Sequence, residues 1–290
     1  MGLSDKILDL SLRKIVRRGR SALGLGNPWL KASIEVTELL GDQVARNIAG
    51  LPRRTPGEVE FNGISLAFND NIALLGMLDE IFVKQNYLFS CANDRPLIVD
   101  CGANIGVGVA YFKSIFPNAI IHAFEPDETA YRCLVENVKR NGYQDVFTNQ
   151  KAVWVRNEEL KFFPDGSWGG GLHAKDSAAA VTVQAVDILD LLELRADFLK
   201  MDIEGAESDV IQHAFDKISA NVDRFFFEWH SFRDASQRLG AILKQFEEAG
   251  FRYHIKEAST RMSPFSTTPP GPMDSQLDVF VFRNASAPLG

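Results

Sequence analysis

Short apolar runs alternate with longer amphipathic segments over most of this chain. The short runs are rich in β-branched and aromatic residues and predict strands, whereas the longer segments have helical periodicity. We expect strands at Leu97–Asp100, Ala119–Phe124, Val146–Val153, Phe198–Asp202, Arg224–Trp229, Phe251–Ile255 and Leu277–Phe282. We expect helices at Gly106–Phe116, Asp127–Asn141, Asp187–Leu194, Ala206–Phe215 and Ala235–Ala249. Because such alternation builds a parallel sheet with right-handed crossovers, the pattern predicts one α/β domain over residues 97–285.

Two smaller regions precede this domain. Residues 1–56 have helical patterns that end in a proline-containing linker, so they are interpreted as an N-terminal helical arm. In residues 57–96, the apolar runs Val59–Phe61 and Ile64–Phe68 flank an Asn-Gly pair, which is a strong hairpin signal, and a helix is expected at Leu74–Phe82. We therefore predict a hairpin and a helix that cap the core domain.

The start of the arm is basic, although the whole chain is acidic. Met1–Gly24 contains six Lys and Arg residues against two Asp residues. No apolar run in it reaches the roughly 18 residues of a membrane span, and none forms the core of a signal peptide. Two interpretations stay open. The arm is either a basic helix that lies on a membrane surface, or an arm that packs on the body of the protein or on a second subunit of a homo-oligomer.

A glycine-containing turn follows the first strand of the core domain. Glycines here permit backbone conformations and close approaches that a Cβ would block. Open α/β sheets bind ligands at the carboxyl ends of their strands, so we expect a small-molecule site at this turn. A dinucleotide is disfavoured, because the third and sixth positions counted from the first glycine are not glycine. The residues expected to contact the ligand are Asp100, Gly102, Ala103, Asn104 and Gly106.

Two acidic residues beside this turn indicate the type of ligand. Asp100 ends the first strand as an anion, which suits a cationic group better than a pyrophosphate. Glu125, followed by Pro126, ends the second strand about 20 residues past the turn, the offset at which an acidic side chain meets a ribose diol. An acid for a ribose and an acid for a cation together indicate S-adenosylmethionine as the cofactor.

The chain resembles the FkbM-type family of S-adenosylmethionine-dependent methyltransferases in three stretches. These are Val99–Gly106, Phe124–Pro126 and, most specifically, Phe198–Glu207. The resemblance spans Phe61–Arg283 and implies a Rossmann-like class I methyltransferase fold, with a seven-stranded, mostly parallel sheet, a reversed last strand and helices on both faces. It also implies methyl transfer, usually to a hydroxyl on a sugar, lipid or polyketide.

A hydroxyl that accepts a methyl group has to lose its proton. The candidate catalytic residues stand at the predicted carboxyl ends of neighbouring strands and are Asp202, Glu204, Glu228 and His230. His230 is favoured as the proton acceptor, because histidine is the commonest general base, and Asp202 is also expected near the cofactor. A divalent ion held by Asp202, Glu204 and Glu228 is the alternative way to lower the hydroxyl pKa. We expect no metal, because the sequence has no dense motif of oxygen ligands.

Composition narrows the substrate class and the compartment. A formal net charge of −7 and a pI of about 5.3 argue against a nucleic-acid substrate. Cys91, Cys101 and Cys133 show no paired spacing, which is typical of reduced thiols in a cytoplasmic protein. We therefore expect an O-methyltransferase that acts on a small hydroxylated acceptor. The main alternative is a non-catalytic S-adenosylmethionine-binding module that recruits a partner through its N-terminal arm.

Overall fold

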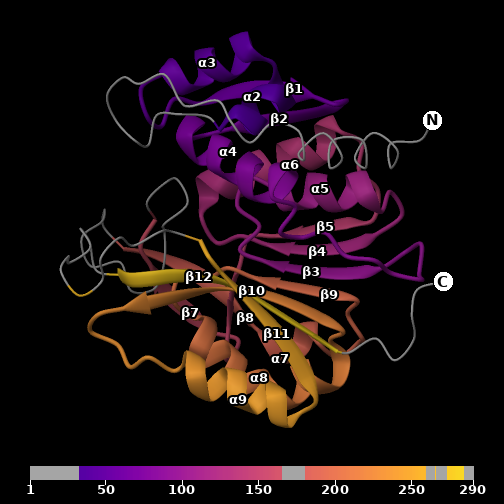
Figure 1. Cartoon of the computed structure of the whole chain (residues 1–290), viewed down its shortest axis with the longest axis vertical. Helices are drawn as coiled ribbons and strands as arrows, with labels where there is room; N and C mark the ends of the chain where they lie inside the picture. The colour runs from indigo at the N-terminus through magenta and orange to yellow at the C-terminus, as the bar shows by residue number, and fades with distance from the viewer. Residues whose placement is uncertain (1–32, 165–179, 259–264, 266–272, 284–290) are drawn as a thin grey trace.

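A seven-stranded sheet forms the centre of the molecule, with helices on both of its faces (Figure 1). This computed structural model describes residues 33–164, 180–258, 265 and 273–283. The strands of the sheet are β3 (Leu97–Cys101), β4 (Ile120–Phe124), β5 (Val146–Asn149), β9 (Phe198–Met201), β10 (Arg224–Phe232), β11 (Phe251–Glu257) and β12 (Met273–Arg283). The helices that follow these strands or lead into them are α5 (Val107–Ile115), α6 (Glu128–Arg140), α7 (Ile188–Leu191), α8 (Glu207–Asn221) and α9 (Leu239–Glu248).

The order of strands across the sheet is β11-β12-β10-β9-β3-β4-β5. β3 pairs in parallel with β4 and β9, and β9 pairs in parallel with β10. β12 is antiparallel to both β10 and β11, so it is the reversed strand. These pairings confirm the expected Rossmann-like sheet. The chain forms one half of the sheet outward from β3 and then the other half outward from β9. In open α/β sheets, ligands bind beside the carboxyl ends of the two strands where the order reverses in this way.

The central strands are apolar because both faces of the sheet are covered. Ile98 on β3 and Leu199 on β9 have no exposed surface. One hydrophobic core lies between the sheet and the layer of α5 and α6, and a second lies between the sheet and the layer of α8 and α9. Burial on both faces explains why these strands appear in the sequence as continuous apolar runs rather than as alternating patterns.

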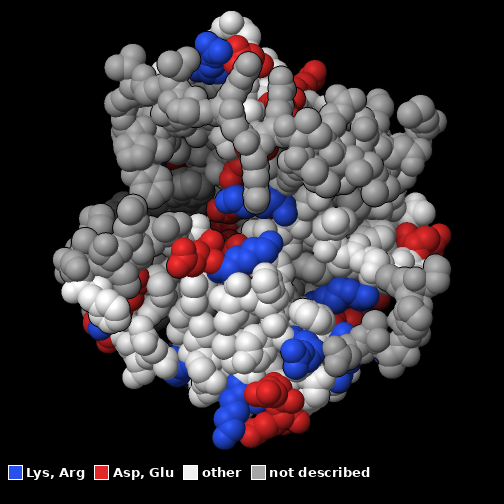
Figure 2. All heavy atoms as spheres, viewed as in Figure 1, with Lys and Arg blue, Asp and Glu red and all other residues white. Residues whose placement is uncertain are grey.

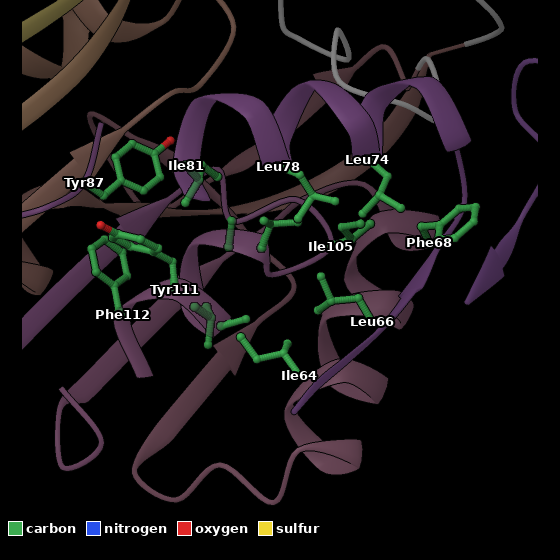
Figure 3. Close-up of a cluster of buried hydrophobic side chains, with 14 of the residues drawn as sticks. Ile64, Leu66, Phe68, Leu74, Leu78, Ile81, Tyr87, Ile105, Tyr111 and Phe112 are labelled. Carbon is green, nitrogen blue, oxygen red and sulfur yellow. The ribbon is translucent and has the colours of Figure 1, made fainter. Parts of the chain in front are cut away.

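The segment before the core packs on the α5 and α6 layer. Its elements are α2 (Ile34–Leu40), α3 (Asp42–Gly50), β1 (Gly57–Phe61), β2 (Ile64–Phe68), α4 (Asn71–Leu78) and the π-helical turn η1 (Asp79–Val83). Figure 3 shows Leu74 and Leu78 of α4 pointing toward Ile105, with Leu66 of β2 in the same cluster. The hairpin and the helix that follows it therefore share one hydrophobic core with the central sheet.

Two asparagines of α6 also hold the hairpin by hydrogen bonds. Asn137 is 2% exposed. It accepts from the Ala67 N–H at 2.6 Å and donates to the carbonyl oxygens of Ala67 and Ile105 at 2.9 and 2.8 Å. Asn141 accepts from the Ser65 N–H at 2.9 Å and donates to the Ser65 carbonyl at 2.7 Å. Each amide satisfies both backbone groups of one β2 residue, so the two side chains substitute for a neighbouring strand.

Some elements differ in extent from the sequence prediction. The strand predicted at Val146–Val153 is divided, because the chain turns after Asn149, where the Lys151 N–H donates to its carbonyl at 3.0 Å. The second part belongs to a three-stranded sheet of β6 (Ala152–Trp154), β8 (Val181–Asp187) and β7 (Glu159–Phe162), in that order. The helix predicted at Leu74–Phe82 ends in the π-helical turn η1. β10 runs longer than predicted, so His230 lies inside that strand rather than after it.

Residues 1–32, with most of the predicted arm and all of its basic part, lie outside the described residues, so both interpretations of the arm stay predictions. Of the helices in the described ranges, none has the length and apolar character needed to cross a membrane. Cys91, Cys101 and Cys133 are free thiols.

Replacing Asn137 with Ala should lower the free energy of unfolding by about 2–4 kcal/mol, because partly buried backbone groups of Ala67 and Ile105 lose their partner. Urea unfolding followed by circular dichroism measures this. Gln144→Ala, at an exposed position after α6, is the matched control and should change the free energy little. A loss for Asn137→Ala no larger than for the control would mean that the hydrogen bonds of Asn137 are not needed to hold the hairpin.

Candidate active site

The carboxyl ends of β3 and β9 meet at the glycine turn. Gly102 has a φ of 82°, and a Cβ at this position would lie 1.8 Å from the carbonyl oxygen of Asp202. Any other residue would collide with that backbone. The Asp202 N–H donates to the Cys101 carbonyl at 3.0 Å, which ties the two strand ends together. At the turn predicted from the sequence, the ends of two neighbouring strands are therefore in tight contact.

The remainder of the turn is fixed by its neighbours β4 and α6. The Ala103 N–H donates to the Phe124 carbonyl at the end of β4, at 2.9 Å. Asn104 has a φ of 48°, a left-handed conformation that asparagine tolerates better than most residues. Gly106, with a φ of 85°, precedes α5, and a Cβ there would lie 2.7 Å from Leu134 Cδ1. The turn is thus held in place by hydrogen bonds and close packing from neighbouring elements.

Glu125, at the end of β4, points at this turn. It is 7% exposed, and its two carboxylate oxygens accept from the N–H groups of Asn104 and Asp127, each at 2.8 Å. Burial raises the pKa of Glu125 to about 7, against the opposing effect of these two hydrogen bonds. Pro126 lies next to Glu125 and has no N–H group to compete for the carboxylate. Each oxygen has a further lone pair, so Glu125 can still accept from a ribose diol.

The anion at the end of β3 has a buried cation beside it. Asp100 is 1% exposed, and within the described residues its Oδ1 accepts no hydrogen bond but lies 3.5 Å from Lys200 Nζ. Nζ is also 3.5 Å from Asp202 Oδ2. Burial opposes the charge on Lys200, but Asp202 and Asp100 outweigh it, so the pKa of the ammonium lies above its ordinary value. Burial raises the pKa of Asp100, and Lys200 acts against that rise.

Asp202, Glu228 and His230 come together at the ends of β9 and β10. One ligand atom from each lies within 4.8 Å of the other two. The parallel ladder pairs Met201 with Phe227, so the residues that follow on both strands reach the same edge of the sheet. Figure 2 shows a hollow near the middle of the visible face with acidic and basic side chains around it. Three of the four candidate catalytic residues are therefore direct neighbours.

Two carboxylates hold the buried imidazole of His230. Its Nδ1 lies 3.1 Å from Glu207 Oε1, and its Nε2 lies 3.4 Å from Glu204 Oε2. Burial alone would lower the pKa of His230, but Glu207 and Glu204 outweigh burial and raise this pKa well above its ordinary value. The two carboxylates therefore favour the protonated imidazole over the neutral one.

Glu207 is positioned by the turn before α8. Its side chain is 1% exposed and accepts from the N–H groups of Ile203 and Gly205, at 3.0 and 3.1 Å. An acid in the first turn of a helix is ordinarily explained by the helix dipole. In this structure Glu207 also orients His230, a role that its position in the sequence did not reveal.

Within the described part of the chain, the Glu228 carboxylate makes no hydrogen bond or ion pair, and it stands beside other acids. The antiparallel ladder of β10 and β12 pairs it directly with Asp278. Burial, followed by the charge of Asp202, raises the pKa of Glu228 well above its ordinary value. Like charges at directly opposed positions destabilise a sheet, so this pair is not explained by stability.

Glu80 and Asp278 complete the acidic surroundings, and sequence reasoning missed both. Burial, then the charge of Asp278, raises the pKa of Glu80 in η1 to about 7. Burial, then the charge of Asp202, raises the pKa of Asp278 to about 6, and Asn86 Nδ2 donates to this carboxyl at 2.9 Å. No local signal could have found them, because only the fold brings η1 and β12 to the end of β10.

Two carboxylates and an imidazole form a donor set that divalent cations accept. The set of Asp202, Glu228 and His230 differs from the predicted metal alternative, which had Glu204 in place of His230. Glu204, with a φ of 56°, lies against the imidazole instead. The metal alternative keeps a geometric basis, and the expectation of no metal stays a prediction.

Comparisons with known proteins give one family model and several similar proteins. The family model described as the Methyltransferase FkbM domain matches residues 100–253. Methyltransferase sdnD of Sordaria araneosa is 27% identical, over 54% of this chain and 75% of that protein. The 31-O-demethyl-FK506 methyltransferase FkbM of Streptomyces tacrolimicus is 29% identical, over 43% of this chain and 47% of that protein. The solved structure of methyltransferase FkbM from Methylobacillus flagellatus covers 73% of this chain and 54% of its own, at 17% identity and a TM-score of 0.46.

The matched region contains the strand ends that form the site. It begins at Asp100 and includes Glu125, Asp202, Glu228 and His230. It covers more than half of the 290 residues. The chain therefore belongs to the FkbM-type family of S-adenosylmethionine-dependent methyltransferases.

Proposed function

We propose that this enzyme transfers a methyl group to a hydroxyl of a small acceptor. The observation that carries the proposal is the Glu228 carboxylate, which stands beside Asp202 and His230 without a hydrogen-bond partner among the described residues. A hydroxyl is a weak nucleophile until a base takes its proton, and a carboxylate with a raised pKa can do so near neutral pH. A site built only to bind the cofactor would have no need of such a group.

The glycine turn and the end of β4 are the parts that fit S-adenosylmethionine. Gly102 lets the ends of β3 and β9 meet closely, and Glu125 has lone pairs for the ribose hydroxyls. Asp100 and Asp202 supply negative charge for a cationic group. When bound, the cofactor supplies a methyl group on a sulfonium, which is activated for in-line displacement. The protein's own task is to align the acceptor and to take its proton.

Glu228, rather than His230, is the proton acceptor in this proposal. Glu207 and Glu204 favour the protonated imidazole of His230, and an imidazolium has no lone pair left to accept a proton. The positive charge of His230 also lowers the pKa of Glu228 and so favours the ionised carboxylate. His230 as the base, the expectation from the sequence, is the competing outcome of the experiments below.

The side chains near Glu228 favour a polar part of the acceptor. Asp278 lies opposite Glu228 and is bonded to Asn86, which accepts from Lys256 Nζ at 3.2 Å. Gln276 lies opposite His230 on the same strand pair. Such a mixture of donors and acceptors suits a hydroxylated molecule, and a sugar, lipid or polyketide acceptor remains the proposal from the family resemblance.

Glu125→Ala should weaken S-adenosylmethionine binding by about 1.5–3 kcal/mol, because charged hydrogen bonds to the ribose are lost. Isothermal titration calorimetry measures the affinity. Glu128→Ala, at an exposed position on α6, is the control and should bind as the wild type does. Unchanged affinity in Glu125→Ala would remove Glu125 from the cofactor site.

Glu228→Gln should lower the methylation rate about 100-fold to 10,000-fold, the usual effect of losing a general base, and leave cofactor affinity unchanged. The rate is measured as release of S-adenosylhomocysteine with a panel of sugar, lipid and polyketide alcohols. His230→Gln in the same assay keeps the carboxylate and removes the imidazole. If Glu228→Gln keeps full turnover while His230→Gln loses it, His230 is the base.

Two further outcomes of that assay would change the proposal. Turnover that survives both substitutions but stops on chelation with EDTA would replace the base with a divalent ion. Cofactor binding without S-adenosylhomocysteine release for any acceptor would favour the non-catalytic binding module.

The rate should rise with pH as Glu228 loses its proton, because only the ionised carboxylate accepts one from the acceptor. Glu80 is among the charges that raise the pKa of Glu228. Glu80→Gln removes that charge and should therefore move the rising limb of the pH–rate profile to lower pH. The test is to measure the pH–rate profiles of the wild type and the variant at saturating cofactor. An unshifted rising limb would mean that the limb does not report the ionisation of Glu228.

A further inference from the structure

Lys200 is a cation at a strand position where an apolar side chain is expected. Its neighbours on β9, Phe198, Leu199 and Met201, are all buried, and Lys200 itself is 4% exposed. A buried ammonium is unfavourable unless it is paired and hydrogen-bonded. The groups around Nζ therefore explain why a lysine is accommodated here.

The ammonium joins the two strand ends that form the cofactor site. Nζ donates to the carbonyl oxygen of Gly102 and, at 3.4 Å, to that of Cys101. It lies 3.5 Å from Asp100 Oδ1 and 3.5 Å from Asp202 Oδ2. One cation thus contacts the end of β3, the first residue of the glycine turn and the residue that follows β9.

Two carboxylates and one ammonium leave this group with a single net negative charge. S-adenosylmethionine carries a positive sulfonium, whereas its product S-adenosylhomocysteine has a neutral thioether at the same atom. A charge near the ligand therefore acts on one of them and not on the other. The ratio of the two affinities reports the net charge of Asp100, Lys200 and Asp202.

We propose that Lys200 is a positioning residue for methyl transfer that also sets this net charge, and so limits how strongly the site prefers the sulfonium to the thioether. Its hydrogen bonds hold the glycine turn against the end of β9. Its charge offsets one of the two carboxylates. The affinity ratio of the charged cofactor to the neutral product is therefore smaller than it would be with two unopposed carboxylates. The inference rests on the cofactor site of the proposed function, but it depends on neither the acceptor nor Glu228.

A set of charge variants separates this role from a structural one. Lys200→Met leaves two carboxylates, Asp100→Asn leaves one carboxylate and the ammonium, and the double variant leaves Asp202 alone. Lys200→Arg keeps the wild-type charge with a different shape. Titration calorimetry on the full chain gives the dissociation constants for S-adenosylmethionine and S-adenosylhomocysteine, with no acceptor present, so failure of the O-methylation proposal does not affect the result.

Preference for the sulfonium should be about three- to tenfold higher in Lys200→Met than in the wild type, and lower by a similar factor in Asp100→Asn. The double variant and Lys200→Arg should keep the wild-type ratio, even where both absolute affinities fall. The double variant also avoids an unpaired buried charge, so the comparison with Asp100→Asn stands if Lys200→Met does not fold. Equal ratios in all folded variants, or the reverse order, would overturn the proposal and leave Lys200 a structural residue.

Discussion

The contact between the backbone of Gly102 and the carbonyl of Asp202 sets the spacing of the whole site. A Cβ at Gly102 would lie 1.8 Å from that oxygen, so the ends of β3 and β9 come as close as backbones can. Lys200 then reaches the turn from the neighbouring strand. The parallel pairing aligns the end of β3 with the end of β4, which Glu125 follows. It likewise aligns the end of β9 with the part of β10 that contains Glu228. The glycine thus fixes the distance between the ends of β3 and β9, the two central strands of the site.

Several carboxyl groups of the site lie close together and are buried, which lowers the stability of the fold. Glu80, Glu228 and Asp278 each have a raised pKa, because burial and neighbouring negative charge disfavour their ionised forms. Lys200 and His230 offset part of this charge from β9 and β10. A raised pKa brings a carboxylate into the range where it transfers protons effectively at neutral pH. The arrangement is therefore unfavourable for stability, which is common at functional sites.

The segment before the core contributes to the site as well as to the core. Glu80 lies in η1, and π-helical turns are frequent at functional sites because they change the direction of side chains. Farther along, Asn86 is bonded to Asp278 of β12. Tyr87 stacks on Phe112 of α5 and packs on Phe226 of β10, with ring centroids 5.7 and 5.0 Å apart. These contacts join the segment to both halves of the sheet.

The sequence by itself determined the alternating elements, the turn at Gly102–Gly106 and the acid Glu125 beside it. These features are local, since a glycine is required by the conformation of its own backbone and a strand by its own run of apolar side chains. Only the tertiary structure decided which groups surround Glu228, because β12 brings Asp278 to it from a distant part of the chain. It also decided that two carboxylates raise the pKa of His230. The pKa of a side chain depends on burial and on neighbouring charges, and these exist only after the chain has packed.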